Sequence, residues 1–139
     1  MKGNDLSLER IDLRPLSAEE RRVLHVLLEP AFPGRDSLMQ QLHVAQVSEE
    51  SRSGCPTIAF QVDPLKAPPA KVRQRIPVEA LGIDVDGQEV HILLHVVDGY
   101  LNELEFFRYD HASVSPIAKL RSIQVSLVPF QTEVYTVTP

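Results

Sequence analysis

The chain has 139 residues, of which 43% are apolar and 24% are charged, with a formal net charge of −5. This composition excludes a disordered chain, and no apolar run approaches the roughly 18 to 20 residues of a membrane-spanning helix. The negative charge disfavours general binding to nucleic acid or to anionic membranes. A single cysteine, Cys55, excludes an internal disulfide framework and most structural zinc sites. The first five residues lack the apolar stretch of a secretory signal, so we expect a cytoplasmic chain.

We expect one domain over residues 1–139, with three segments that flank or connect its regular elements. Residues 1–16 form an N-terminal arm, residues 64–77 a proline-rich crossing loop, and residues 111–139 a C-terminal arm or edge strands. The crossing loop holds four of the eleven prolines. Proline at this density favours extended backbone over helix or a central strand.

Two helices are predicted near the N-terminus. Ser17 followed three residues later by Glu20 is a capping box, which marks a helix start. Pro30 cannot donate to the helix ladder, so this helix should end near Glu29. A shorter helix is predicted over residues 35–42. The side chains that we expect to face inward are Leu24, Leu27, Leu28, Ala31, Leu38 and Leu42.

Strands follow the helices. Alternating apolar residues predict a half-buried strand over residues 58–62, with a weaker partner strand over 44–48. Three further runs, 80–85, 89–97 and 100–109, are separated by Asp86-Gly87 and Asp98-Gly99. Because Asp-Gly favours a two-residue hairpin turn, these runs predict an antiparallel three-stranded meander.

Two-residue turns fix the pairing of the meander. They place Ile83 opposite Val90, Leu81 opposite Ile92, and Val96 opposite Leu101. The face that we expect to pack against the helices is then formed by Leu81, Ile83, Val90, Ile92, Leu94 and Val96.

Strict alternation would bury Glu103 and Glu105 on that face. Burying two carboxylates costs several kcal/mol unless they are paired. We therefore predict a β-bulge near Asn102 or Glu103, which turns both glutamates outward and brings Leu101, Leu104 and Phe106 to the core. Together these elements predict an α+β fold, with the two N-terminal helices packed on one face of a mainly antiparallel sheet that contains the meander at about 78–110.

Four residues on the opposite face are the candidates for chemistry. His91 and His95 point to the same side of one strand but lie roughly 13 Å apart, which excludes a shared ion without a bend. Glu103 and Glu105 share a strand face at roughly 7 Å, a spacing that suits acid–base chemistry, a hard cation or an ordinary solvated surface. A carboxylate beside either histidine after the bulge would suit a general acid–base pair.

Other chemical signals are weaker. Cys55 has no local histidine and no helix start beside it, so we interpret it as a structural cysteine. Lys66, Lys71, Arg73 and Arg75 form a basic loop without aromatic stacking residues. The sequence contains no phosphate loop, dinucleotide fingerprint, nucleophile elbow or zinc-protease motif, and we assign it no metal and no cofactor.

The stretch Gly54-Cys55-Pro56-Thr57-Ile58 and the motif Asp-Gly-x-Leu-x-x-Leu-Glu at residues 98–105 are shared with a known group. With residues 14–20 and Phe32-Pro33-Gly34, they resemble a family of small uncharacterised bacterial proteins, a domain of unknown function, over roughly residues 12 to 110. Its members carry Cys-x-Cys-Gly-Cys-Pro, whereas Ser51 and Ser53 stand in place of the additional thiols here. The resemblance therefore implies the architecture and no activity.

Our leading hypothesis is a non-catalytic binding or protein-interaction module that self-associates as a homodimer. A sheet face bearing His91, Leu93, His95, Val97 and Tyr100 is too apolar to stay in water, so either segment 122–138 or a second copy should cover it. One alternative is a small-ligand binder or enzyme that uses the face of His91, His95, Glu103 and Glu105. A second alternative is a nucleic-acid-associated factor that uses the basic loop 66–75.

Overall fold

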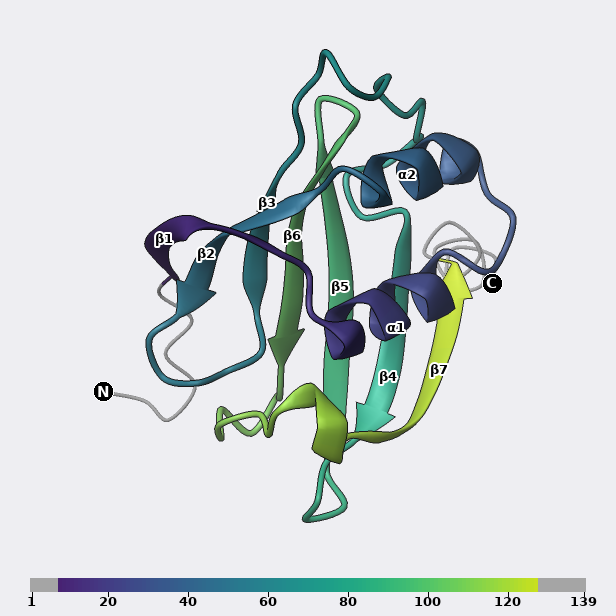
Figure 1. Ribbon diagram of the computed structural model, residues 1–139. Helices are drawn as coiled ribbons and strands as arrows, with labels where there is room; N and C mark the ends of the chain where they lie inside the picture. Colours follow the sequence, from purple (N-terminus) through teal and green to yellow (C-terminus); the bar gives the residue numbers. More distant parts are fainter. Residues whose placement is uncertain (1–7, 128–139) are drawn as a thin grey trace.

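The computed structural model describes residues 8–127, which form two α-helices, one short 3-10 helix and seven strands (Figure 1). The helices are α1 (Ala18–Leu27), α2 (Arg35–Leu42) and η1 (Ile117–Lys119). The strands are β1 (Leu8–Pro15), β2 (Gln46–Ser51), β3 (Ile58–Gln61), β4 (Val78–Ile83), β5 (Glu89–Val97), β6 (Tyr100–Phe107) and β7 (Arg121–Leu127). Within this part of the chain, no helix is long and apolar enough to cross a membrane.

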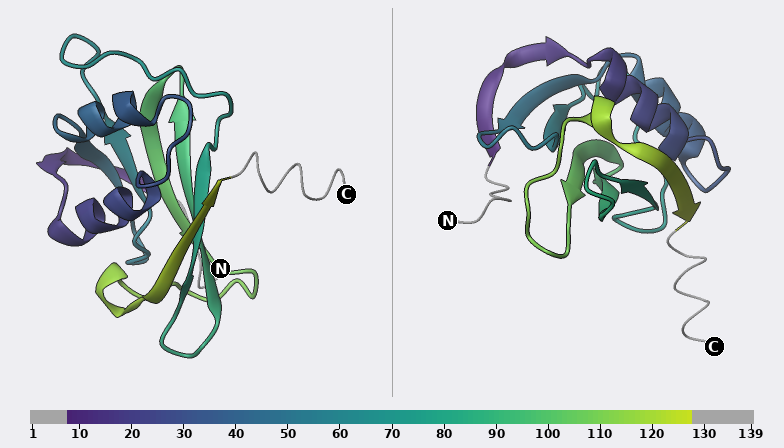
Figure 2. Two further views of the ribbon diagram at one scale, coloured as in Figure 1. Left: turned by 90° about the vertical axis from the view of Figure 1, so that its right-hand side faces the viewer. Right: turned by 90° about the horizontal axis from the view of Figure 1, so that it is seen from below.

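All seven strands belong to one antiparallel sheet in the order β1-β2-β3-β6-β5-β4-β7. Helices α1 and α2 lie side by side on one face of this sheet, as the two turned views show (Figure 2). The apolar core fills the space between the helices and that face. The predicted α+β fold is confirmed, and its centre is the β4–β5–β6 meander.

The helix signals in the sequence act as expected. The Ser17 hydroxyl accepts a hydrogen bond from the Glu20 amide, and the Glu20 carboxylate accepts one from the Ser17 amide, so the capping box forms. Helix α2 has the predicted bounds, and it starts after Gly34, whose positive φ of 89° suits glycine. Most of the predicted inward side chains are buried, but Ala31 is exposed because α1 ends before it.

One of the two predicted hairpin turns has the expected form. Asp98 and Gly99 both have positive φ and join β5 to β6 in two residues, so Val96 pairs with Leu101 as predicted. The prediction for Asp86-Gly87 is wrong, since the connection between β4 and β5 runs from Asp84 to Gln88. At the start of this connection, the Asp84 amide donates a hydrogen bond to the Gln88 carbonyl, and the buried Asp84 carboxylate accepts hydrogen bonds from the Val85 and Ser115 amides.

The longer connection shifts the β4–β5 pairing by one residue. Leu81 lies opposite His91, and Ile83 lies opposite Glu89. Because a one-residue shift exchanges the two faces of a strand, the predicted core positions of β4 are also wrong. Val78 and Ala80 face the core instead, while Leu81 is 39% exposed.

The predicted β-bulge is confirmed in β6. His95 pairs with Glu103 and Val96 pairs with Leu101, so Asn102 is the extra residue. The side chains of Leu101, Leu104 and Phe106 are consequently buried, and both glutamates lie on the opposite face. The Val96 amide donates a hydrogen bond to the Arg75 carbonyl, 2.7 Å away, which ties the crossing loop to the bulged region.

The buried amide side chain of Gln41, which no sequence pattern predicts, holds the end of this hairpin. The Gln41 Nε2 group donates to the carbonyls of Pro68 and Gly99, and its Oε1 atom accepts from the Leu101 amide. The Gln41 side chain is fully buried, and its hydrogen bonds join α2, the crossing loop and the β5–β6 turn.

The predicted arms contribute edge strands. Residues 8–15 of the N-terminal arm pair with β2 as β1, and residues 121–127 of the C-terminal segment pair with β4 as β7. The remainder of both arms, 1–7 and 128–139, lies outside the described residues. The weaker strand expected over 44–48 occupies 46–51.

The assignment of faces in β5 predicts a clear ranking of stability effects. Leu94 is fully buried between Leu104 and Val78, so Leu94→Ala should cost about 2–5 kcal/mol of unfolding free energy. His91→Ala, on the opposite face, should cost far less. Urea titrations of both variants measure the ranking, and the reverse order would contradict the assignment of the two faces.

Candidate functional site

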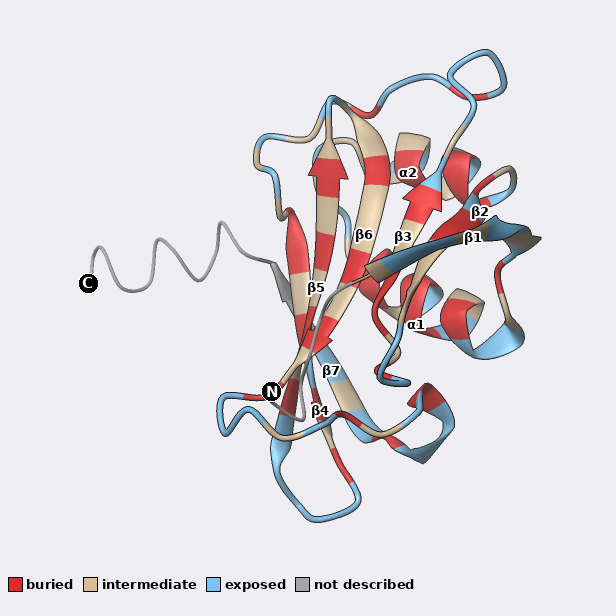
Figure 3. Ribbon diagram, turned by 90° about the vertical axis from the view of Figure 1, so that its left-hand side faces the viewer, coloured by how far each residue is buried: buried red, intermediate tan, exposed pale blue. Residues whose placement is uncertain are grey.

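The four candidate residues lie on the sheet face turned away from the helices, which we call the outer face. Its described side chains include Leu81, His91, Leu93, His95, Val97, Glu103, Glu105 and Phe107. Buried and half-buried positions alternate along β5 and β6 (Figure 3). The outer face is thus the second surface of a sheet whose other surface is already covered by helices.

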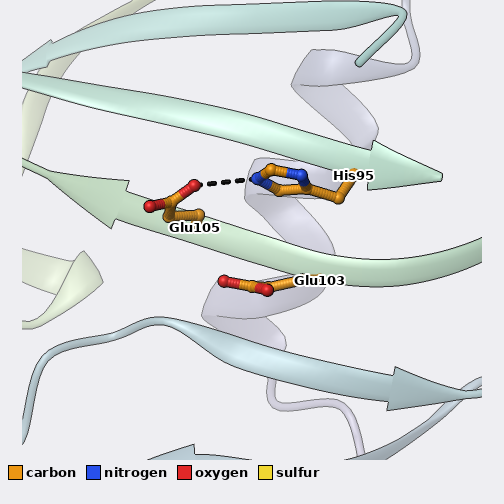
Figure 4. A group of neighbouring side chains, drawn as sticks. All are labelled: His95, Glu103 and Glu105. Carbon is orange, nitrogen blue, oxygen red and sulfur yellow. Dashed lines mark hydrogen bonds and ion pairs between the residues drawn. The ribbon is translucent and has the colours of Figure 1, made fainter. Parts of the chain in front are cut away.

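Three of the four candidates come together at one end of this face. The His95 Nε2 atom lies 2.8 Å from Glu105 Oε1, and Glu103 lies beside them (Figure 4). Each residue contributes one potential ligand atom, and the three atoms lie within 4.8 Å of one another. We call these residues the His–Glu cluster. The bulge builds it, because Glu103 becomes the direct partner of His95 only when Asn102 is left unpaired.

The surroundings of Glu103 disfavour the charged form of its carboxyl group. Burial raises the pKa of its carboxyl group, and the neighbouring Glu105 raises it further, while His95 and Arg75 act in the opposite direction. Among the described residues, no hydrogen bond or ion pair to the Glu103 carboxylate is found. A half-buried carboxylate without a direct partner attracts a positive charge.

The orientation of His95 bears on catalysis. Its Nε2 atom is engaged by Glu105, and its Nδ1 atom is buried without a hydrogen-bond partner in the described part of the protein. A general base needs a ring nitrogen within reach of the proton that it removes. In this arrangement Nε2 is occupied by Glu105 and Nδ1 is buried, so neither nitrogen of His95 meets that requirement.

His91 belongs to a different cluster further along the outer face. Its ring stacks on Phe107 with centroids 5.1 Å apart, and it meets the Tyr109 ring at 4.3 Å. Phe107 and Tyr109 contact each other edge to face, and Tyr109 is 72% exposed. We call these three residues the aromatic cluster. The structure therefore separates His91 from His95.

The remaining sequence candidates lie elsewhere. Cys55 is buried, and its sulfur lies 3.4 Å from the Thr57 hydroxyl and 3.6 Å from the Phe106 carbonyl. These contacts agree with the structural role expected for it. The basic side chains of the crossing loop, Lys66, Lys71, Arg73 and Arg75, are all exposed.

A network of charged side chains that no sequence pattern predicted lies at the end of the sheet where β4 connects to β5. The buried Arg108 guanidinium contacts the carboxylates of Asp84, Asp86 and Asp110. Hydrogen bonds from Arg108 lower the pKa of Asp110 to about 2. The network ties the β4–β5 connection to the segment after β6. Because one buried guanidinium holds all three carboxylates, we interpret the network as structural.

The electrostatics of Glu103 predict an effect of pH on stability. The pKa of the Glu103 carboxyl group is raised on folding, so ionising it opposes folding as the pH rises above its ordinary value of about 4.5. Glu103→Gln should therefore raise the urea midpoint at pH 7.5, and the gain should shrink towards pH 4. The exposed Glu89 provides a control, since Glu89→Gln should leave the midpoint unchanged. A Glu103→Gln variant that is less stable at pH 7.5 would refute this reasoning.

Comparisons with known proteins identify a family. A family model described as "Domain of unknown function (DUF6984)" matches residues 13–119, which include α1, α2, the bulge and both clusters. No curated protein and no solved structure matches the chain. The match agrees with the resemblance to an uncharacterised domain family. Because it spans more than half of the sequence, the chain belongs to the DUF6984 family.

Proposed function

We propose that the protein is a non-catalytic interaction module that pairs with a second copy of itself through the outer face of the sheet. The observation that carries this proposal is the aromatic cluster of His91, Phe107 and Tyr109, which ends in a Tyr109 ring that is 72% exposed. Leu81 lies opposite His91 and is also exposed. Aromatic side chains are enriched at the centres of protein interfaces.

The distribution of charge on this face favours a two-fold pairing centred on the aromatic cluster. His91 and His95 are four residues apart on β5, so the two clusters are separated by about 13 Å. A two-fold axis that passes through the aromatic cluster perpendicular to β5 runs the two β5 strands in opposite directions, so the His–Glu clusters of the two copies would lie about 26 Å apart along the strands. That distance exceeds the Debye length of about 8 Å at physiological salt, so their repulsion would be screened.

The orientation of His95 supports a non-catalytic role, because neither of its ring nitrogens is both free and accessible. We further propose that the module acts in the cytoplasm. A single buried cysteine without a disulfide partner fits a reducing compartment.

Sedimentation velocity at micromolar concentration and pH 7.5 tests the pairing. We expect the wild-type chain to be a dimer and Tyr109→Lys to be a folded monomer, because it places a charge in the interface. Leu65→Lys makes the same kind of change at a site that is 93% exposed on the crossing loop, and it should remain dimeric. A monomeric wild-type chain, or a Tyr109→Lys dimer, would contradict the proposal.

A further inference from the structure

The His–Glu cluster combines three donor groups that the fold brings together from two strands. His95 comes from β5, and Glu103 and Glu105 come from β6 (Figure 4). Their donor atoms lie within 4.8 Å of one another, and one nitrogen–oxygen pair is already in contact at 2.8 Å. Two ligands that share an ion at about 2.1 Å are roughly 3.0–3.4 Å apart. His95 and Glu105 thus need to separate by only a fraction of an ångström to hold one.

The charges of the cluster also favour a cation. Two carboxylates flank one imidazole. The exposed Arg75 of the crossing loop acts on Glu103 only as a charge through space, since the described residues form no ion pair with the Glu103 carboxylate. Glu103 is half-buried, so water compensates its charge only in part. A cation between the carboxylates would relieve both their mutual repulsion and the incomplete solvation of Glu103.

We propose that His95, Glu103 and Glu105 bind one divalent transition-metal ion, of the class of Zn²⁺ or Mn²⁺. One imidazole nitrogen with two carboxylate oxygens suits these ions, whereas Ca²⁺ requires six to eight oxygen ligands. Three protein ligands leave at least one coordination position open to water or to a ligand. The site is independent of self-association, because all three ligands come from one chain.

The surroundings of the His95 ring limit the affinity of this site for a metal ion. An ion on Nε2 displaces the proton shared with Glu105, and the neutral ring then carries its proton on Nδ1. That atom is buried with no acceptor among the described residues, whereas metal-binding histidines almost always donate their second N–H to a partner. We therefore expect micromolar rather than nanomolar affinity. Protons compete for the same ligands, so binding should weaken as the pH falls.

Isothermal titration of the metal-stripped full chain with ZnCl₂ and with MnCl₂ at pH 7.5 tests the site. We expect one ion per chain for at least one of the two metals. Glu103→Gln and Glu105→Gln should each weaken binding by about tenfold or more. Glu105→Gln keeps an acceptor for His95, so it preserves the fold if a change at the histidine does not. His91→Gln on the same strand, and Glu89→Gln at its start, are matched controls that should bind normally.

The outcomes separate this site from the proposed dimer. If Tyr109→Lys is monomeric and still binds one ion, the cation site stands whether or not the chain self-associates. Absence of saturable binding for both metals would overturn the proposal. Binding that survives Glu103→Gln and Glu105→Gln together would overturn it as well, because the ion would then sit at other surface groups.

Discussion

A regular alternation of side chains along β6 cannot bury all of its apolar residues and also keep its two glutamates on the outer face. Leu101 and Leu104 are both buried, although three positions separate them and a regular strand places such residues on opposite faces. The unpaired Asn102 resolves the conflict by adding one residue between them. The core thereby gains Leu101, and the carboxylates of Glu103 and Glu105 remain on the outer face. The His–Glu cluster exists because of this one insertion.

The bulge is held in place from several directions. Next to it, the Val96 amide bonds to the Arg75 carbonyl, and the Ala70 amide bonds to the Gly99 carbonyl. Gln41 adds hydrogen bonds from α2 to the same end of the hairpin. A Cβ on Gly99 would lie 2.7 Å from the Pro69 Cβ, so glycine also permits the close approach of the crossing loop. The proline-rich segment therefore fixes the geometry of a cluster to which it contributes no ligand.

Hydrophobic periodicity and turn chemistry predicted most of the fold. The capping box at Ser17, the bounds of α2 and the Asp98-Gly99 hairpin follow from local rules, and the bulge follows from the cost of burying Glu103 and Glu105. The predicted register of β4 was wrong because the register depends on Asp84. The Asp84 carboxylate accepts hydrogen bonds from two residues distant in sequence, Arg108 and Ser115. No local pattern reveals such a partner.

The sequence predicted which residues belong to the candidate site, but it did not predict that they form two separate clusters. Period-two alternation put both histidines on the outer face, and the bulge added the glutamates. Only the three-dimensional register separates His91, which stacks on Phe107, from His95, which pairs with Glu105. The position of Tyr109 beside His91 lies after the end of β6, where strand periodicity no longer applies.

Cross-strand proton contacts measured by nuclear magnetic resonance test the bulge most directly. We expect backbone protons of His95 to contact those of Glu103 and those of Leu93 to contact those of Glu105, while Val96 remains paired with Leu101. Asn102 should show no partner of its own on β5. Contacts of His95 with Asn102 would instead indicate an unbroken register, and they would contradict both the origin and the existence of the His–Glu cluster.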